Sequence, residues 1–331
     1  MISRRTFVGA VTAGFLATPL AARAQSAGKV YRIGLLSTLP PGTSGVTRLW
    51  EPFVQGLREL GYVEGENLLI ERRYAPEGQP DQLPELAADL VRLKVDVIVA
   101  GGSLTPHAAK SATTTLPVIF TNHGDPLGSG LVVSLARPGG NITGLSLLSP
   151  ELVGKQLELF KTAVPRIVRM AVLWNPTSQT HPRMLNEAEA PARALGLRLE
   201  RLPARGLDDY DRAFAAMTRA RADALLVLGD PIFWYQRSRI VELSTKHRLP
   251  GIFGQREYVE AGGLMSYGAN LRDNFRRAAT YVDKILKGAR PGDLPIEQPS
   301  KFELVINSRT AKALGLTILQ SVLLRADQII E

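Results

Sequence analysis

Residues 95–126 read VDVIVAGGSLTPHAAKSATTTLPVIFTNHGDP and contain two apolar runs in succession. The first run, VDVIVA, breaks at GGS, and the second, PVIF, breaks at TNHGDP. A helical pattern over residues 106–112 separates them, which is the order of a strand, a helix and a parallel strand. The carboxyl ends of parallel strands meet at one edge of a sheet, where free loop amides and helix N-termini bind ligands. This stretch therefore predicts half of a binding site.

Apolar runs and helical periodicities alternate along the rest of the chain. Strands are expected at residues 30–36, 67–74, 142–145, 169–174, 197–202, 224–228, 251–253, 262–267 and 302–306. Helices are expected at residues 47–60, 81–93, 128–136, 151–163, 181–195, 210–221, 233–247, 270–287 and 310–314. The alternation is typical of an α/β fold in which helices cover both faces of parallel sheets.

The two halves of the chain are locally similar. VDVIVAGG at residues 95–102 is similar to ADALLVLGD at residues 222–230, and Gly-Asp-Pro follows a strand at residues 124–126 and again at 229–231. We therefore expect two lobes of similar construction whose strand-end loops face a shared cleft. Residues 224–235 are the expected counterpart of residues 95–126.

The first 24 residues have the features of a secretory signal peptide. Arg4 and Arg5 precede a short apolar segment, and the small residues of ARA at 22–24 predict cleavage before Gln25. The sequence SRRTFV is similar to the twin-arginine export motif, and both export routes remain open. No later stretch is long and apolar enough to span a bilayer. A periplasmic location is the expectation.

Composition and motifs argue against several classes of protein. The 331 residues carry a formal net charge of +9 and no cysteine, so disulfides, thiolate metal sites and thiol nucleophiles are excluded. The basic residues are scattered and aromatic residues are scarce, which disfavours nucleic-acid binding. GxGxxG, P-loop and GxSxG motifs are absent, so no cofactor is expected. The histidines have no metal-ligand spacing, and we expect them at the surface or in loops: His107, His123, His181 and His247.

Four segments resemble the substrate-binding proteins of ABC transporters, in the group that includes tryptophan- and tyrosine-binding members. They are FVQGLRELGYVEGENLLIERRYAPEG (residues 53–78), LPELAADLVRLKVDVIVAGG (83–102), LPVIFTNHGDPLGSGLVVSLARPGGNITGLS (116–146) and LVINSRTAKALGL (304–316). The resemblance implies a type I periplasmic binding fold, with two Rossmann-like lobes joined by three crossovers and a ligand in the cleft between them. It also implies that the protein delivers its ligand to an inner-membrane permease and catalyses nothing. A monomer without a metal site is expected.

Boundaries follow from that expectation. Crossovers are expected near residues 145–150, near residues 267–271 and in the Pro/Gly-rich connector before Phe302. The first lobe would comprise residues 29–146 plus about 270–298, and the second residues 147–269 plus about 299–331. Two alternatives stay open: an exported α/β enzyme that uses Asp125 and Asp230 as acid and base, and a module that presents a ligand to a receptor.

A zwitterionic ligand needs hydrogen-bond donors for its carboxylate. Ser103 and Thr105 lie where a strand ends and a helix begins, so they suit a carboxylate or else cap the helix. Thr121 and Asn122 follow the adjacent strand and could complete the same pocket. Weaker candidates are Ser37, at the end of the first strand, and Ser146, near a crossover.

The remaining candidates would bind the ammonium group and the side chain of the ligand. Asp230 is the preferred partner of the ammonium, although it could instead cap the following helix. Asp125 contacts the ligand or braces its own loop. Aromatic walls would favour an aromatic or hydrophobic ligand, and Arg256 could pair with a carboxylate. The residues in these predicted walls are Trp174 with its neighbour Asn175, Trp234 and Tyr267.

Overall fold

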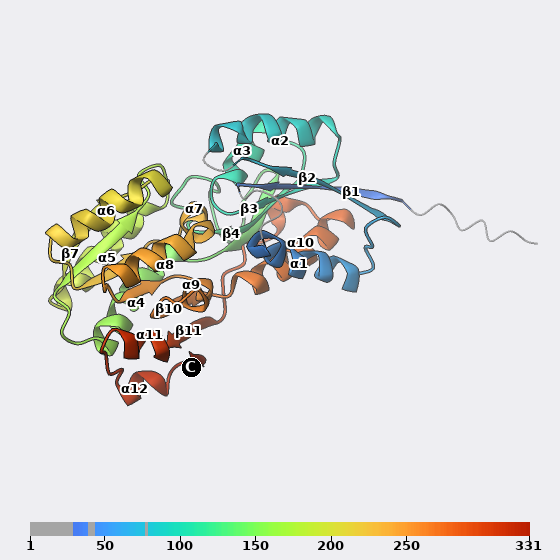
Figure 1. Cartoon of the computed structure of the whole chain (residues 1–331). Coiled ribbons are helices and arrows are strands. Elements are labelled where there is room, and N and C mark those ends of the chain that lie inside the picture. The colour runs from blue at the N-terminus through green and yellow to red at the C-terminus, as the bar shows by residue number, and fades with distance from the viewer. Residues whose placement is uncertain (1–28, 39–43, 77–78) are drawn as a thin grey trace, which may run out of the picture. The chain divides into compact units, whose positions relative to one another are not determined.

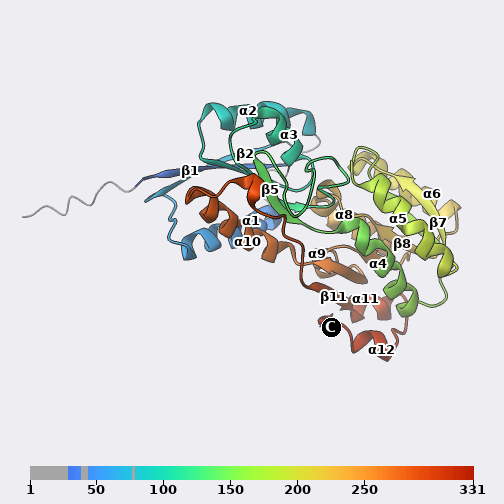
Figure 2. The same ribbon diagram turned by 180° about the vertical axis from the view of Figure 1, so that it is seen from behind.

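The computed structural model describes residues 29–38, 44–76 and 79–331. The predicted signal peptide lies outside these residues, as does most of the loop that follows the first strand. The described residues from Tyr31 to Glu331 belong to one compact unit. The compact unit contains two β-sheets, each covered by helices on both faces (Figures 1 and 2).

The first sheet has five parallel strands in the order β2-β1-β3-β4-β5. Its strands are β1 (Tyr31–Ser37), β2 (Leu68–Tyr74), β3 (Val97–Gly101), β4 (Val118–His123) and β5 (Ile142–Ser146). Its helices are α1 (Ser44–Glu59), α2 (Leu83–Arg92), α3 (Thr105–Ala112) and α10 (Leu271–Leu286), and a 3₁₀ turn, Pro80–Gln82, precedes α2. We call this sheet with these helices the first lobe.

Strand alternation explains how the first sheet is buried on both faces. Side chains of successive strand residues point to opposite faces. Val118 and Phe120 join the apolar cluster beneath α2 and α3, whereas Ile119 joins the cluster that includes α1 and α10. A strand that is apolar on both faces needs helices on both sides, as the sequence predicted.

The second sheet has seven strands in the order β12-β11-β10-β9-β8-β6-β7, and only the β10–β11 pair is antiparallel. Its strands are β6 (Arg169–Trp174), β7 (Arg198–Pro203), β8 (Ala224–Val227), β9 (Gly251–Phe253), β10 (Met265–Ala269), β11 (Phe302–Asn307) and β12 (Gln328–Ile330). Its helices are α4 (Ser149–Ala163), α5 (His181–Ala194), α6 (Leu207–Arg219), α7 (Pro231–Tyr235), α8 (Arg237–Lys246), α9 (Arg256–Glu260), α11 (Ser308–Ala313) and α12 (Gln320–Leu323). We call this sheet with these helices the second lobe.

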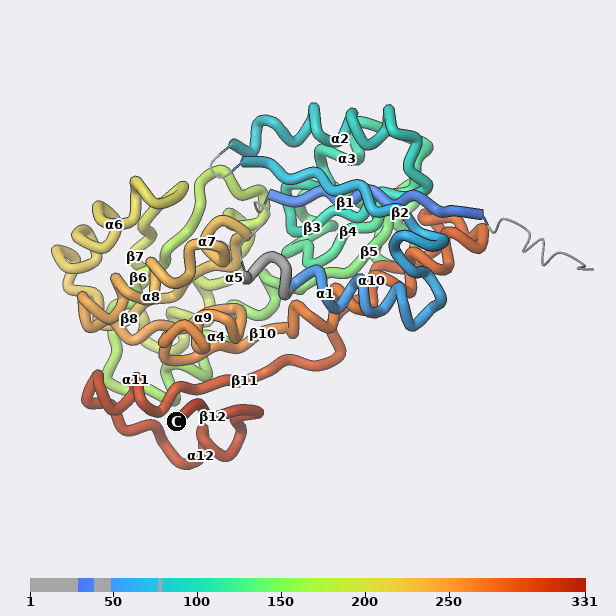
Figure 3. Tube along the Cα trace, turned by 45° about the vertical axis from the view of Figure 1, so that its right-hand side comes forward, coloured from blue at the N-terminus to red at the C-terminus, as the bar shows by residue number. Residues whose placement is uncertain are grey.

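The chain passes between the lobes three times (Figure 3). The first passage lies between β5 and α4, and the second is at Asn270, between β10 and α10. Helix α10 packs against β4 and β5 of the first sheet. The third passage follows the 3₁₀ turn Pro291–Asp293, where the chain returns to the second sheet and enters β11. The predicted α/β architecture, with two lobes and parallel sheets, is therefore confirmed.

Several predicted elements differ in the structure. Residues 128–136 form turns instead of the expected helix, and a carboxylate oxygen of Asp125 accepts a hydrogen bond from the backbone N–H of Gly128 there. The helix expected at residues 233–247 is two helices, α7 and α8, separated at Gln236, whose side-chain oxygen accepts a 2.6 Å hydrogen bond from the hydroxyl of Tyr210. Helix α9 and strand β12 were not predicted.

Within the described part of the chain, no helix is both long enough and apolar enough to cross a bilayer.

Candidate functional site

A cavity lies between the two lobes at the carboxyl ends of their strands. It holds about 640 Å³ of space free of protein atoms, including its opening to solvent. Both strand-edge segments line it, as the sequence predicted. Residues that line it are Ser37, Thr38, Leu49, Trp50, Gly101, Gly102, Ser103, Asn122, Gly124, Leu147, Ser149, Gly229, Asp230, Pro231, Trp234, Gln255, Leu271 and Phe275.

The first lobe contributes a polar edge to the cavity. The hydroxyl of Ser103, after β3, accepts a 3.1 Å hydrogen bond from the backbone N–H of Gly124, after β4, so the two strand-end loops are tied together. Gly102 has φ of +89°, and a Cβ there would lie 3.0 Å from Cγ of Pro231 on the second lobe. Glycine at this position therefore allows the two lobes to approach closely.

Asp230 provides the charge at the opposite edge. Among the described residues that line the cavity, it has the only ionisable side chain. Its Oδ1 accepts hydrogen bonds from the backbone N–H groups of Ile232 and Phe233, so Asp230 caps α7 as well as lining the cavity. Its Oδ2 accepts a 3.1 Å hydrogen bond from the amide of Asn175, which itself lies outside the cavity.

His181 holds this edge in place. Its Nδ1 accepts a 2.8 Å hydrogen bond from the backbone N–H of Asn175, so the ring proton is on Nε2, which donates to the carbonyl of Gly229 at 3.1 Å. Burial lowers the pKa of His181, although Asp230 opposes that effect. The neutral ring therefore links the ends of β6 and β8, from which Asn175 and Asp230 extend.

Two amide side chains that line the cavity carry buried polar atoms without a hydrogen-bond partner in the structure. Asn122 has φ of +55° and is 8% exposed, and neither its amide oxygen nor its amide nitrogen is paired. Gln255, which follows β9, is 9% exposed and has an unpaired amide oxygen. Unpaired buried polar groups are costly, which favours their pairing with a bound ligand. The sequence analysis missed Gln255, although it stands two residues after a predicted strand.

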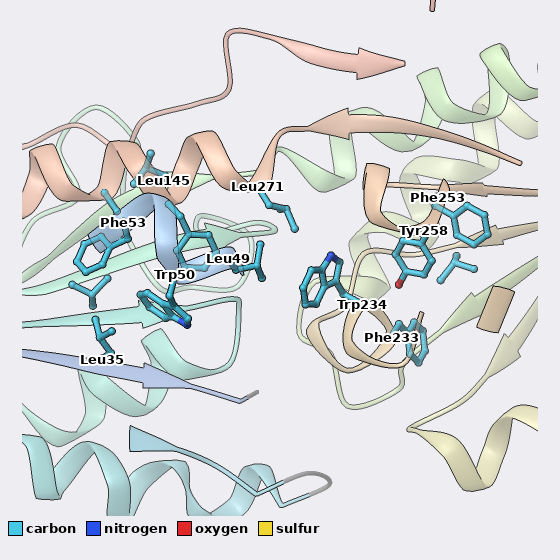
Figure 4. Close-up of a cluster of buried hydrophobic side chains, with 14 of the residues drawn as sticks. Leu35, Leu49, Trp50, Phe53, Leu145, Phe233, Trp234, Phe253, Tyr258 and Leu271 are labelled. Carbon is cyan, nitrogen blue, oxygen red and sulfur yellow. The ribbon is translucent and has the colours of Figure 1, made fainter. Parts of the chain in front are cut away.

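Apolar side chains form the opposite wall of the cavity. Trp50 from α1 and Phe275 from α10 meet edge to face, with ring centroids 4.7 Å apart. Trp234 extends from α7 of the second lobe toward Leu49 and Leu271 of the first lobe (Figure 4). Except for Trp234, sequence reasoning missed this wall, because apolar residues on an amphipathic helix are expected to face a core.

Several predicted ligand residues lie outside the cavity, some with hydrogen-bond partners of their own and some without. Thr105 donates a 2.9 Å hydrogen bond to the carbonyl of Gly101, and the hydroxyl of Ser146 accepts one from the N–H of Leu148. The hydroxyl of Thr121 and the indole nitrogen of Trp174 are buried and unpaired, but neither residue lines the cavity. Tyr267 packs its ring against Phe302, at a centroid distance of 5.9 Å.

Asp125 forms an ion pair between the lobes. Its Oδ2 accepts a 2.8 Å hydrogen bond from Arg183 of α5, while its Oδ1 accepts one from Gly128 within its own loop. Arg183 also contacts Glu151 of α4 at 3.0 Å. This ion pair raises the pKa of Arg183. Asp125 does not line the cavity. Its two contacts stabilise its own loop and the approach of the two lobes.

A second and more polar groove, of about 1230 Å³ including its opening, adjoins the cavity. Leu49 and Trp234 line both spaces. Arg256 lies in this groove and not in the cavity, and it forms ion pairs with Glu260 at 3.0 Å and Glu303 at 3.1 Å.

The histidines differ from the sequence expectation, because His123 and His181 are fully buried. Burial lowers the pKa of His123 to about 3, with a further contribution from His107. His123 is thus neutral at physiological pH, and its Nδ1 accepts a hydrogen bond from the N–H of Asp125. Within the described ranges, no group of three or more acidic or histidine side chains could hold a metal ion.

Comparisons with known proteins agree with this geometry. A family model described as ABC transporter substrate binding protein matches residues 44–330. A tyrosine-binding protein from Clostridioides difficile (strain R20291) is 27% identical over 265 residues, which cover 80% of this chain and 75% of that protein.

Two solved structures are similar along nearly the whole chain. A conserved domain protein from Vibrio cholerae O1 biovar El Tor has a TM-score of 0.85 at 30% identity, covering 91% of this chain and 100% of that one. An ABC domain from Streptococcus pneumoniae in complex with L-Trp has a TM-score of 0.84 at 28% identity, covering 91% and 99%. The fold is the type I periplasmic binding fold.

Proposed function

Because this chain belongs to the family of ABC transporter substrate-binding proteins, we propose that it binds a single amino acid with an aromatic or large apolar side chain between its lobes. One observation carries the proposal: among the described residues that line the cavity, Asp230 alone is charged, and aromatic side chains form part of the walls. A relative named as tyrosine-binding and a similar structure that contains L-Trp support this ligand class.

The ligand's three groups have complementary partners in the cavity. Asp230 would pair with the ammonium, because buried charges require a counter-charge. Ser103, Asn122 and the strand-end N–H groups would donate to the carboxylate, with Ser37 nearby. Trp50, Trp234 and Phe275 would surround the side chain, where aromatic rings stack or meet edge to face.

We further propose export to the periplasm through the signal peptide at residues 1–24 and delivery of the ligand by a monomer to an inner-membrane permease. The lobes would comprise residues 29–146 plus about 270–298, and residues 147–269 plus about 299–331. An enzymatic role is disfavoured, because Asp125 lies outside the cavity and pairs with Arg183, which leaves Asp230 without the second carboxylate that an acid and base pair would need.

A thermal-shift screen with the mature protein tests the ligand class. At a concentration one hundred times the Kd, a ligand stabilises the fold by about 2.7 kcal/mol. We expect L-tryptophan, L-tyrosine or L-phenylalanine to raise the Tm by several degrees. N-acetyl-L-tryptophan, which lacks the ammonium, is the matched control and should have little effect. A protein whose Tm responds to none of the three amino acids, and from which mass spectrometry recovers no small molecule, would contradict the proposal.

The Asp125–Arg183 ion pair predicts how the lobes close around a ligand. Asp125→Asn keeps an oxygen to accept from Gly128 but loses the charge that Arg183 pairs with across the cleft. Because Arg183 is partly exposed, we expect a loss of about 1 kcal/mol, or about fivefold in affinity, by calorimetry. Arg193→Gln is the control, since Arg193 of the same helix pairs only within the second lobe, with Glu189. Equal affinities for Asp125→Asn and the wild type would argue against a role in closure.

A further inference from the structure

Trp234 separates the ligand cavity from the outer groove. Among the described residues, Trp234 and Leu49 alone line both spaces, and Trp234 is 4% exposed. Figure 4 shows the indole extending from the second lobe toward Leu49 and Leu271. The indole of Trp234, together with Leu49, therefore lies between the cavity and the groove.

Two residues behind the indole restrain it from different directions. The guanidinium carbon of Arg237 lies 4.4 Å from the ring centroid, which is a cation–π geometry, and Nη1 of the same side chain donates to the carbonyl of Trp234 at 3.0 Å. The indole Nε1 donates a long hydrogen bond, 3.4 Å, to Oε2 of Glu257. Arg237 thus holds the face of the ring, and Glu257 holds its edge.

Both restraining residues lie outside the cavity that would hold the ligand. Arg237 and Glu257 line the outer groove and are absent from the lining of the cavity. They come from different helices, α8 and α9, and each can be replaced without altering a side chain that lines the cavity. Their effect on a ligand would pass through Trp234.

We propose that Arg237 and Glu257 are positioning residues that hold Trp234 as a partition, and that this partition limits the length of the ligand the cavity accepts. The size limit rests on the proposed function, whereas the positioning roles do not. Without the indole, the cavity would open into a groove of about 1230 Å³ that is lined mainly by charged side chains. A ligand with a polar extension, such as a dipeptide, would then fit where the wild-type protein accepts a single amino acid.

The positioning roles can be tested without any ligand. The chain contains three tryptophans, so 5-fluorotryptophan labelling gives three ¹⁹F resonances, and Trp234→Phe assigns one of them. Arg237→Met and Glu257→Ala should each shift and broaden the Trp234 resonance while leaving those of Trp50 and Trp174 in place. Glu257→Gln should restore most of the wild-type shift, because its amide oxygen can accept from Nε1.

Matched controls come from the same two helices. Arg239→Met removes an arginine of α8 that pairs with Asp211 and Glu242, and Glu260→Ala removes a glutamate of α9 that pairs with Arg256. Neither should move the Trp234 resonance. If Arg237→Met and Glu257→Ala move it no more than these controls do, the positioning roles are wrong.

The size limit is tested by calorimetric titration with L-tryptophan and the dipeptide L-tryptophylglycine. Trp234→Ala should lower the affinity for L-tryptophan at least tenfold and gain measurable binding of the dipeptide. Arg237→Met and Glu257→Ala should each lower the ratio of the affinity for L-tryptophan to the affinity for the dipeptide. The controls Arg239→Met and Glu260→Ala should leave this ratio unchanged. Unchanged selectivity in Trp234→Ala would overturn the size limit. Failure of the wild type to bind any aromatic amino acid would instead count against the proposed function, and the ¹⁹F spectra would still decide the positioning roles.

Discussion

Replacing Asp230 with asparagine should weaken the binding of L-tryptophan about 100-fold while the protein still folds. Removing one partner of a buried, hydrogen-bonded charge pair typically costs 2–5 kcal/mol, and 100-fold corresponds to about 2.8 kcal/mol. The large effect is expected because Asp230 is the only ionisable side chain among the described residues that line the cavity. No other carboxylate there could take over the ammonium.

The asparagine variant separates the charge of Asp230 from its role as a helix cap. Asparagine caps a helix as well as aspartate does, so Oδ1 can still accept from the N–H groups of Ile232 and Phe233. Its amide nitrogen would face the amide nitrogen of Asn175, at a cost of about 1 kcal/mol and a few degrees in Tm. Asp230→Ala also loses the cap and should be less stable than Asp230→Asn.

A ligand without an ammonium isolates the charge effect. N-acetyl-L-tryptophan binds weakly to the wild-type protein under this hypothesis, and its affinity should change little in Asp230→Asn. Calorimetry with both ligands and both proteins therefore forms a thermodynamic cycle. If the two ligands lose affinity by the same factor, Asp230 does not pair with the ammonium.

Replacing Gly268 with alanine should lower the free energy of unfolding by about 3 kcal/mol. Gly268 lies in β10, beside Gly254, which is the residue that follows β9. A Cβ added to Gly268 would lie 2.9 Å from the carbonyl carbon of Gly254 and even closer to the carbonyl oxygen of Gly254. The obstacle is backbone, which cannot rotate away as a flexible side chain would. Overpacking of this kind typically costs 1–3 kcal/mol.

A urea titration followed by circular dichroism measures this loss. Gly206→Ala is the control, because its backbone is extended at φ of 172° and the nearest atom to an added Cβ is 3.9 Å away. The control should lose less than about 1 kcal/mol. Gly268→Ala should also weaken ligand binding, since Gly254 precedes Gln255, which lines the cavity. Wild-type stability in Gly268→Ala would mean that β9 and β10 can separate at little cost.

The strand edges of the site were predictable from sequence because they depend on local signals. An apolar run that ends in small polar residues marks the carboxyl end of a parallel strand, and all such ends in one sheet lie together. This reasoning located Ser37, Ser103, Asn122 and Asp230, which line one cavity in the structure. It could not separate them from Thr105, whose hydroxyl turns back to the carbonyl of Gly101 one helical turn earlier.

The helical wall of the site was not predictable in the same way. Trp50 and Phe275 lie on apolar helix faces. The sequence pattern of such a face is the same whether the face covers a core or borders a cleft. Which of the two occurs depends on how closely the lobes approach, and that is set by contacts distant in sequence. Gly102 against Pro231 and Asp125 against Arg183 are two such contacts.

Two predicted helices differ from the structure at points where a side chain forms a hydrogen bond. A helix was expected at residues 128–136, but the segment contains Gly128 and Gly130, and the carboxylate of Asp125 accepts a hydrogen bond from the N–H of Gly128 at its start. The helical pattern of residues 233–247 is continuous in sequence, yet Tyr210 binds the side chain of Gln236 at the point where α7 gives way to α8. Asp125 and Tyr210 both lie outside the segments that they contact. The spacing of apolar residues within a segment therefore could not predict these hydrogen bonds.

The ion pair between Asp125 and Arg183 also identifies where optical probes would report on the cleft. The chain has no cysteine, so introduced thiols would be the sole sites for maleimide dyes. Leu127 lies two residues from Asp125 and is 44% exposed, and Glu187 lies one helical turn from Arg183 with a side chain that is 52% exposed. A donor dye at one position and an acceptor dye at the other would convert separation of the two lobes into a change in energy-transfer efficiency. Under the proposed function, fluorescent domains at the same two positions would make a genetically encoded, reagent-free amino-acid sensor.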